Sequence, residues 1–549
     1  PTKGHSRPGR RRRTTTSTLY ILTARTLGTE QSTPNSSLTH LLAHRVGVAQ
    51  SMTNSSNDTE SSSIAQAESR PRPSQPLFFH IPPYGTHHEA RGWALDAIGR
   101  SVSFVGNAVF VGTAVIHLAR MNAGCDPNDV ACEGRTTYGI RPSSFLTLYN
   151  VIVGVSSSAL LPLLGSIVDH THHRRLVARI SAGVYCAALF PMIFLNESTW
   201  FAACVLLVFT AFVGWIHTGM TFAYLPEMSD DKKDLEDLNT SFAVVQFATY
   251  VVYAVIIVGI TAAMGRTDDS IFTAKLAQSI SFVVTTVVWG YAWSKLMGHR
   301  PATTELPEGS NLIATGFRNL YRSGIHVWNN HRSLAWFYIA IAFSESAVQA
   351  LVVIATTYSI EVLDFSSFDS GISFLIFVFF SSIGCYIAPM SVRRINPIRS
   401  DQLCLFLIGL FTALASAFVK SVDQKMLFFV FTMLWGICGG WKYTIERYLV
   451  CNIIPKGQDA ELMGMYLFAG QCLAWLPPLV FTAMNEAGVS IRISMVSLVL
   501  FWIIAVAFLQ CMGSYHSIVR EVSEPPSESP PPDCQLQIDT VASNEERLG

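Results

Sequence analysis

Charged and amide side chains that interrupt long apolar runs are the residues best placed to do chemistry in this chain. Glu345 lies inside AFSESAVQALVV, and Gln349 follows one helical turn later on the same face. Ionisable groups are costly in apolar surroundings, where they bind a solute, exchange a proton or hydrogen-bond across helices. Asn107, Gln246 and His217 are weaker candidates of the same kind. We therefore predict a solute-binding or proton-coupling site centred on Glu345, with a structural hydrogen bond as the alternative.

A second charged pair lies further along the chain. Lys442 and Glu446 are four residues apart within an apolar stretch. Side chains at this spacing are neighbours on a helix surface, so we expect the two to form an ion pair.

Enzyme motifs are missing from the sequence. It contains neither a GxxxxGK phosphate-binding loop nor an HExxH metal motif. The cluster DHTHH at 169–173 is contiguous, a geometry poorly suited to binding one metal ion. We expect no enzyme activity, no catalytic residue, no cofactor and no metal site, and the zero net charge gives no general attraction to nucleic acid.

The elements that must position these residues are membrane helices. Half of the 549 residues are hydrophobic and only 14% are charged, whereas soluble proteins carry about 25% charged residues. Apolar runs of membrane-spanning length recur along the chain, because a bilayer core needs roughly 20 apolar residues per helix. We predict an all-α polytopic membrane protein with about twelve spans. They are Ser101–Leu118, Phe145–Val168, Leu176–Leu195, Phe201–Leu225, Phe242–Met264, Leu276–Leu296, Leu334–Leu363, Ile372–Met390, Leu403–Val419, Met426–Val450, Leu462–Met484 and Ile493–Met512.

These spans fall into two groups of six. The predicted organisation is a tail at 1–88, a six-helix bundle at 89–296, a linker at 297–333, a second bundle at 334–512 and a tail at 513–549. Both tails are polar or proline-rich, a composition typical of disorder. The basic, serine-rich start also fits an organelle-targeting segment, whereas the favoured alternative is that translation begins at Met52.

Basic residues near the span ends predict the orientation. Arg174, Arg175, Arg393 and Arg394 and the arginines of the linker fall on one side, although Arg120, Arg135 and Arg141 fall on the other. We expect the arginine-rich side, with both termini, to face the cytosol.

Two of the eleven cysteines stand apart from the spans. Cys125 and Cys132 flank a short turn in the first non-cytosolic connection. That side is oxidising if it is luminal or extracellular, so we predict a disulfide between them. A zinc site is the less favoured alternative, since two further ligands are not in view.

Two six-helix halves joined by a cytosolic linker resemble the major facilitator superfamily of secondary transporters, which expose a central cavity to each side in turn. The loop after the second span is similar to the superfamily's glycine–aspartate–basic motif, with Gly165, Asp169, Arg174 and Arg175. The resemblance implies a cytosolic gate: Gly165 for close helix approach, Asp169 facing a helix N-terminus, and arginines pairing across the gap. The alternative is an interfacial charge cluster that only fixes topology.

The region of the tenth and eleventh spans resembles the autophagy-related vacuolar amino-acid effluxer family and its bacterial relatives. Similar segments are WALDAIGRS in the first span and AYLPEM after the fourth, and the resemblance covers roughly residues 92 to 512. A phenylalanine usual in the family is replaced by Leu462 or Met463, and a polar position before the arginine holds Glu446. The matching residues are Gly439, Gly440, Arg447, Ile454, Pro455, Lys456, Ala460, Glu461, Gly464 and Tyr466.

Within this region a polar turn predicts a second part of the gate. Pro455 and Gly457 end one helix, and Asp459 and Glu461 begin the next, where the helix dipole favours acids. Arg447 lies within reach of Glu461, so we predict a gate-side clamp, with simple helix capping as the alternative.

The resemblance implies a secondary transporter that moves amino acids out of a vacuole or lysosome-like compartment, with proton coupling as one way to drive it. One alternative is a major facilitator transporter of another solute at the plasma membrane. A second is a non-transporting membrane scaffold or receptor. Membrane lipid and a small solute are the expected partners, and we expect a monomer.

Overall fold

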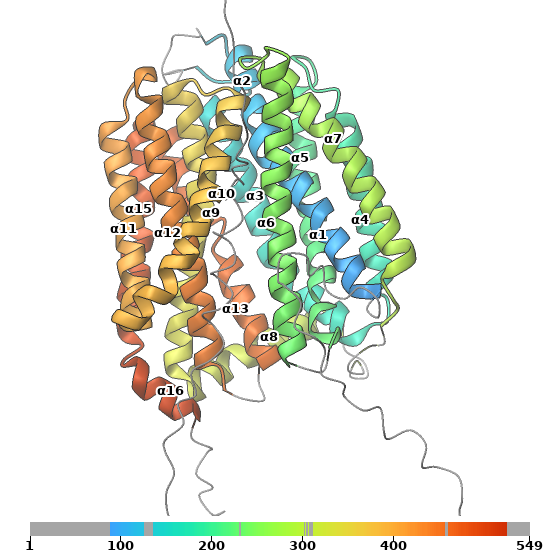
Figure 1. The fold of residues 1–549 in the computed structure, drawn as a ribbon, viewed down its shortest axis with the longest axis vertical. Coiled ribbons are helices and arrows are strands. Elements are labelled where there is room, and N and C mark those ends of the chain that lie inside the picture. The colour runs from blue at the N-terminus through green and yellow to red at the C-terminus, as the bar shows by residue number, and fades with distance from the viewer. Residues whose placement is uncertain are drawn as a thin grey trace, which may run out of the picture. The chain divides into compact units, whose positions relative to one another are not determined.

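The computed structural model describes residues 88–125, 135–229, 232–300, 302, 306, 311–455 and 459–523. All of these residues belong to one compact unit. Within them the chain is helical, apart from an isolated bridge between Thr137 and Ile140 (Figure 1).

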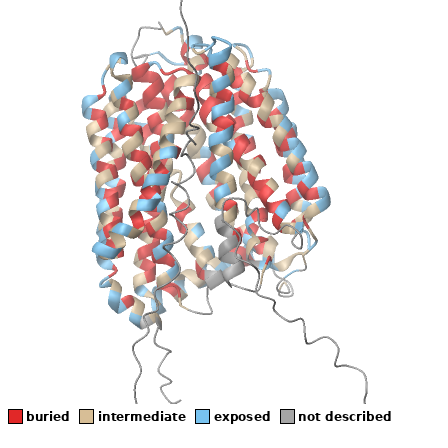
Figure 2. Cartoon of the chain, viewed as in Figure 1, coloured by how far each residue is buried: buried red, intermediate tan, exposed pale blue. Residues whose placement is uncertain are grey.

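Twelve helical segments among the described residues are long and apolar enough to cross a membrane, which confirms the predicted number. Exposed residues recur along the helices of the bundle (Figure 2). They include large apolar residues such as Phe406, Val287 and Ile503, as expected of helices that lipid surrounds. The spans are His88–Asn122, Pro142–His170, Arg174–Met192, Trp200–Phe222, Ser241–Ala263, Ser270–Leu296, Arg332–Leu363, Ser367–Arg394, Pro397–Phe418, Val422–Ile453, Leu462–Glu486 and Ile491–Cys511.

The first six spans, here called the N-terminal half, surround a first helix that begins much earlier than predicted. That helix starts at His88 rather than Ser101, since its charged residues are paired inside the bundle and do not interrupt it. It continues through a short π-helical segment, a form often found at functional sites. The elements are α1 His88–Val105, η1 Gly106–Val111, α2 Gly112–Asn122, η3 Pro142–Ser144, α3 Phe145–His170, α4 Arg174–Met192, α5 Trp200–Phe222, η4 Leu225–Glu227, α6 Lys232–Ala263, α7 Ser270–Tyr291 and η5 Ala292–Leu296.

The linker and the last six spans, here called the C-terminal half, follow. The predicted linker contains a helix, α8, and the predicted C-terminal tail opens with another, α16. The eleventh span is broken between α13 and α14, where Pro477 and Pro478 lack the N–H groups that a continuous helix needs. The elements are α8 Leu312–Asn330, α9 Arg332–Leu363, α10 Ser367–Arg394, α11 Pro397–Phe418, η6 Val422–Gln424, α12 Lys425–Ile453, α13 Asp459–Cys472, α14 Leu476–Glu486, α15 Ile491–Cys511 and α16 Tyr515–Ser523.

Glycines bring α10 and α12 together inside the C-terminal half. A Cβ atom added at Gly440 would collide with the backbone of Ser381, and one at Gly384 with the backbone of Ile437. Glycine is needed at such positions because any side chain would force the two helix backbones apart. Close packing of α10 on α12 therefore depends on these glycines, and an ion pair between Lys425 and Asp369 at 3.1 Å joins the same two helices.

Polar contacts join the two halves at the end of the bundle that carries Asn122, here called the Asn122 end. The Asn485 amide donates to the hydroxyls of Ser143 and Ser144, each at 2.7 Å. Arg120 donates to the carbonyl oxygen of Ile360 at 3.0 Å, and the Thr113 hydroxyl donates to Ser370 at 3.1 Å. The opposite end, where α8 lies, is here called the linker end.

Candidate functional site

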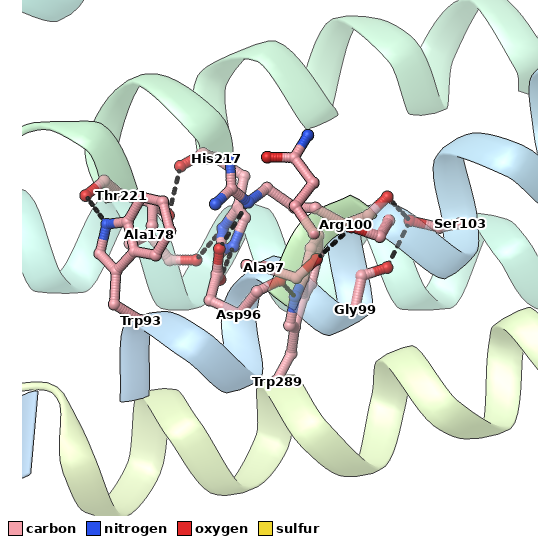
Figure 3. A network of polar contacts seen from close by, with 12 residues as sticks. Trp93, Asp96, Ala97, Gly99, Arg100, Ser103, Ala178, His217, Thr221 and Trp289 are labelled. Atoms are coloured by element: carbon pink, nitrogen blue, oxygen red, sulfur yellow. Dashed lines mark hydrogen bonds and ion pairs between the residues drawn. The ribbon is translucent and has the colours of Figure 1, made fainter. Parts of the chain in front are cut away.

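A buried ionic network in the N-terminal half is centred on Asp96 of α1 (Figure 3). One carboxylate oxygen lies 2.7 Å from Nε2 of His217, and the indole N–H of Trp293 donates to the same oxygen at 2.8 Å. The other oxygen lies 2.8 Å from Nε of Arg100, one turn along α1. Asp96 and His217 are fully buried, so this carboxylate depends entirely on these partners.

The histidine in this network has both ring nitrogens engaged. Nδ1 of His217 lies 3.1 Å from the carbonyl oxygen of Ala178 and 3.2 Å from the Ser181 hydroxyl. That hydroxyl donates to the Ala178 carbonyl at 2.9 Å. Both ring nitrogens therefore have hydrogen-bonding partners among the buried groups around Asp96.

Aromatic rings enclose this network. The ring of His217 lies 4.0 Å from that of Trp289, whose N–H donates to the backbone oxygen of Asp96 at 3.0 Å. The guanidinium of Arg100 lies over Trp93 and Phe222, at 4.9 and 5.0 Å from the ring centroids. The network thus joins α1, α4, α5 and the end of the sixth span.

A second buried cluster in the C-terminal half is centred on Lys442 of α12. Its Nζ atom lies 2.7 Å from a carboxylate oxygen of Glu345 on α9 and 2.7 Å from one of Glu446. The pairing of Lys442 with Glu446 confirms the interpretation from their spacing. Glu446 also accepts a hydrogen bond from the Ser344 hydroxyl at 3.0 Å.

A third acid, Asp401 of α11, belongs to this cluster. It is 1% exposed and interacts electrostatically with Glu446 and Lys442. Neither of its carboxylate oxygens has a hydrogen-bond partner among the described residues. The cluster therefore contains three carboxyl groups and one ammonium, whereas the network around Asp96 contains one carboxyl group, one guanidinium and one imidazole.

Only one acid of this cluster is substantially accessible. The side chain of Glu345 is 29% exposed, whereas those of Lys442 and Glu446 are each 2% exposed. The amide of Gln349 lies 3.4 Å from Glu345 and 3.4 Å from the carbonyl oxygen of Gly470. The structure thus brings together the two residues predicted from their spacing.

The break in the eleventh span lies next to this pair. The Ser158 hydroxyl of α3 donates to the carbonyl oxygen of Gln471 at 3.0 Å, so the N-terminal half supports the break. A Cβ atom added at Gly154 would lie 2.8 Å from the backbone nitrogen of Trp475. Discontinuous helices near the contact between halves are typical of the solute sites of transporters.

The partly exposed charges of the two halves are linked through tyrosines. Tyr250 of α6 interacts electrostatically with Arg100 in its own half and with Tyr443 of α12. Tyr443 in turn interacts with Glu345 and Arg447. Each half thus places one partly exposed charge near a tyrosine, Arg100 near Tyr250 and Glu345 near Tyr443.

The other predicted solute-site residues lie near the N-terminal network. Asn107, in the π-helical segment, is buried and donates to the Tyr185 hydroxyl at 3.4 Å. Gln246 donates to the Tyr250 hydroxyl at 2.7 Å. Both residues belong to the N-terminal half, whereas Glu345 lies on α9 of the C-terminal half.

The predicted cytosolic gate is local to the N-terminal half in this conformation. Buried Arg174 bonds Glu227 at 2.7 Å rather than a residue of the other half. Arg175 donates to the backbone oxygen of Ser294 at 3.3 Å, and Asp169 interacts electrostatically with Arg174 and Glu227. The alternative of a charge cluster that stabilises one half fits these contacts.

The role expected for Gly165 in close helix approach is wrong in this conformation. A Cβ atom added there would meet nothing within 4 Å. The close contact lies three residues earlier, where Gly316 of α8 packs directly on the backbone of Pro162. The linker helix α8 therefore makes its close approach to α3 at Pro162 and not at Gly165.

The second part of the gate is only partly described. Arg447 is exposed and lies 4.2 Å from the ring centroid of Tyr443, but the side chain of Glu461 lies outside the described residues. Cys125 is in a disulfide, whereas Cys132, its predicted partner, lies outside the described residues. The Arg447–Glu461 clamp and the Cys125–Cys132 pairing stay predictions.

Several residues that build the site were missed in the sequence. Arg100 follows Asp96 by four residues, a spacing that itself indicates an ion pair. Glu227, in the LPE segment, pairs with Arg174 and also lies 3.7 Å from Arg300. Nothing local in the sequence distinguishes Asp401 from an exposed acid at a helix start.

Metal coordination has no support in the described part of the chain. No group of three histidine, cysteine, aspartate or glutamate residues there has the geometry to hold a metal ion. The adjacent rings of His172 and His173 lie 4.0 Å apart and point to no shared ligand.

Comparison with models of protein families identifies the family of this chain. The model of the vacuole effluxer Atg22-like family matches residues 85–520. The chain belongs to this family, which confirms the resemblance seen in the sequence. No curated protein sequence is significantly similar to the chain.

Solved structures show the same fold. A mutant form of the nucleoside transporter NupG has 12% sequence identity and a TM-score of 0.53, and the match covers 78% of this chain and 100% of that one. The inward-open xylose transporter XylE from E. coli has 13% identity and a TM-score of 0.51, covering 78% and 98% of the two chains. The chain therefore has the twelve-span fold of major facilitator transporters, and its family is one of vacuole effluxers.

Proposed function

We propose that this protein releases amino acids from a vacuole or lysosome-like compartment by alternating access. One observation carries the proposal: each buried network presents one partly exposed charged side chain, and the two charges are of opposite sign. Arg100 is 15% exposed and Glu345 is 29% exposed. A solute with one positive and one negative group is complementary to this pair.

Amino acids have this charge pattern. A guanidinium binds a carboxylate with two parallel hydrogen bonds, so Arg100 would hold the α-carboxylate of the solute. Glu345 would accept hydrogen bonds from its α-ammonium group. The half-exposed rings of Phe104 and Tyr443 offer apolar surface for its side chain. The family supports this solute class, and the names of the structural neighbours, which refer to a nucleoside and to xylose, do not.

Orientation and location form a second part of the proposal. The polar contacts at the Asn122 end support an arrangement in which the site is reached from the linker end. We propose that the linker end, with both termini, faces the cytosol, as the arginine distribution indicates. Protease-accessible tags at the termini of the protein in isolated vacuoles test the orientation, and fluorescent tagging tests the membrane.

The decisive experiment is efflux of radiolabelled leucine and lysine from acidified proteoliposomes. We expect efflux from the wild type and a loss of at least tenfold in Glu345→Gln, since the amide cannot neutralise the solute ammonium. Glu197→Gln, a change of the same kind at an exposed loop position, serves as the control and should transport normally.

Other results would redirect the proposal. Equal efflux in wild type and Glu345→Gln would leave a transporter but give Glu345 a structural role. Folded wild type that moves no amino acid but moves another solute would support a different transporter of the same fold. No flux of any solute would favour a scaffold or receptor.

A further inference from the structure

We propose that Asp401 carries an exchangeable proton and that this proton couples transport to the pH gradient across the membrane. The inference rests on the proposed function as a transporter, but it concerns a residue that does not face the solute site. It begins from the unequal numbers of acids and bases in the cluster around Lys442.

The hydrogen bonds determine which acid can be neutral. Both oxygens of Glu446 accept bonds, from Lys442 and Ser344, and both oxygens of Glu345 face donors, on Lys442 and Gln349. These two carboxyls therefore act as acceptors, the role of the ionised form. One ammonium between two carboxylates already leaves an excess negative charge.

Asp401 would add a further negative charge beside this excess. It is 1% exposed, and neither oxygen has a hydrogen-bond partner among the described residues. An unpartnered carboxylate is costly inside a membrane protein, whereas a protonated carboxyl is not charged. The site therefore favours a proton on Asp401.

Among the helices packed against α11, α12 presents charged groups to Asp401. Helix α12 presents Glu446 and Lys442 to Asp401, and α11 itself contributes Cys404, whose Sγ lies 3.2 Å from the carbonyl oxygen of Cys438. The charged groups of the other neighbours lie elsewhere. Arg393 and Arg394 are exposed at the end of α10, Arg399 is exposed on α11, and Arg492 of α15 lies beside Ser416 at the opposite end of α11.

The coupling step moves one proton and breaks no other bond. Loss of the proton from Asp401 leaves a second carboxylate next to Glu446, and gain of the proton removes it. Lys442 connects this charge directly to Glu345, because its ammonium contacts both glutamates. The protonation of Asp401 thus alters the electrostatic environment of the proposed solute-binding carboxylate without contact between Asp401 and the solute.

The test compares gradient-driven flux with counterflow of labelled leucine in proteoliposomes. In the wild type, a gradient of one pH unit should change solute accumulation by up to about tenfold for each coupled proton. Asp401→Asn should lose this response in both gradient orientations while counterflow stays within about twofold of the wild type. Asp423→Asn, at an exposed position, should behave like the wild type, and Asp401→Glu should keep the response.

The outcomes separate this inference from the proposed function. A normal gradient response in Asp401→Asn, or no gradient response in a wild type that performs counterflow, would overturn the role of Asp401. Absence of counterflow in the wild type would instead contradict amino-acid transport.

If the variants do not fold, an infrared spectrum of the wild type still tests whether Asp401 is protonated. The wild-type spectrum should contain the carbonyl-stretch band of a protonated carboxylic acid, and it should shift in D₂O. Absence of that band at neutral pH would overturn the proposal, whether or not any variant is stable.

Discussion

The two halves use buried charge in opposite ways. Around Asp96, the side chains of Arg100 and His217 and the indole N–H of Trp293 converge on one carboxylate, and the contacts join helices that are distant in sequence. Around Lys442, three carboxyls surround one ammonium; the pair with Glu345 joins α12 to α9, and glycine contacts bring α10 against α12. The comparison teaches that both oxygens of Asp96 have close polar partners, whereas those of Asp401 have no hydrogen bond among the described residues.

The largest effect is expected where a charge has a structural role. Asp96→Ala removes the shared acceptor of Arg100 and His217 and leaves both buried without it. Breaking a buried ionic network in this way costs about 3–5 kcal/mol, so the variant should unfold at a much lower temperature or fail to fold. Thermal unfolding in detergent measures this, with Asp268→Ala in an exposed loop as the control. A variant as stable as the wild type would remove the structural role of the network.

The next effect tests how the C-terminal half is held together. Gly440→Val places a side chain against the backbone of Ser381 and should cost about 1–3 kcal/mol, since α10 and α12 must separate. Gly165→Val carries the same change in helix propensity, but no atom lies within 4 Å of the added Cβ. Comparison of the two unfolding temperatures isolates the packing cost. Equal losses would show that α10 and α12 have room to adjust.

Contacts between residues that are close together in the sequence could be predicted, whereas contacts between distant residues could not. The twelve spans follow from runs of apolar residues, and the pair of Lys442 with Glu446 follows from their spacing; both are confirmed. The partners of Asp96 and Glu345 are not local: His217 is separated from Asp96 by 121 positions and Lys442 from Glu345 by 97. Only the packed helices bring them together, so the sequence indicated single charged residues but not the networks.

A smaller effect should separate the two roles open to His217. If the histidine only holds α1 against α5, His217→Gln should lose about 1.5–3 kcal/mol of stability, because its buried hydrogen bond to the Asp96 carboxylate is altered. Leucine efflux per folded molecule should then stay near the wild-type rate and keep its response to the pH gradient. His172→Gln, at an exposed position, controls for the loss of an imidazole. Loss of the gradient response at unchanged stability would instead return His217 to the coupling role predicted from the sequence.

The smallest effect on stability is expected at Asp401, and it makes the comparison sharpest. Asparagine has nearly the shape of a protonated aspartate, so Asp401→Asn should change the free energy of unfolding by less than about 1 kcal/mol if the native side chain is already neutral. Asp96→Asn is the same chemical change at the ionised site and should be strongly destabilising, since Arg100 and His217 lose the charge that they share. The measurement is the difference between the two variants in thermal unfolding under identical conditions. Replacing a neutral aspartic acid by asparagine leaves the charge of the cluster around Lys442 unchanged. Similar losses of stability at both positions would therefore mean that Asp401 is also ionised.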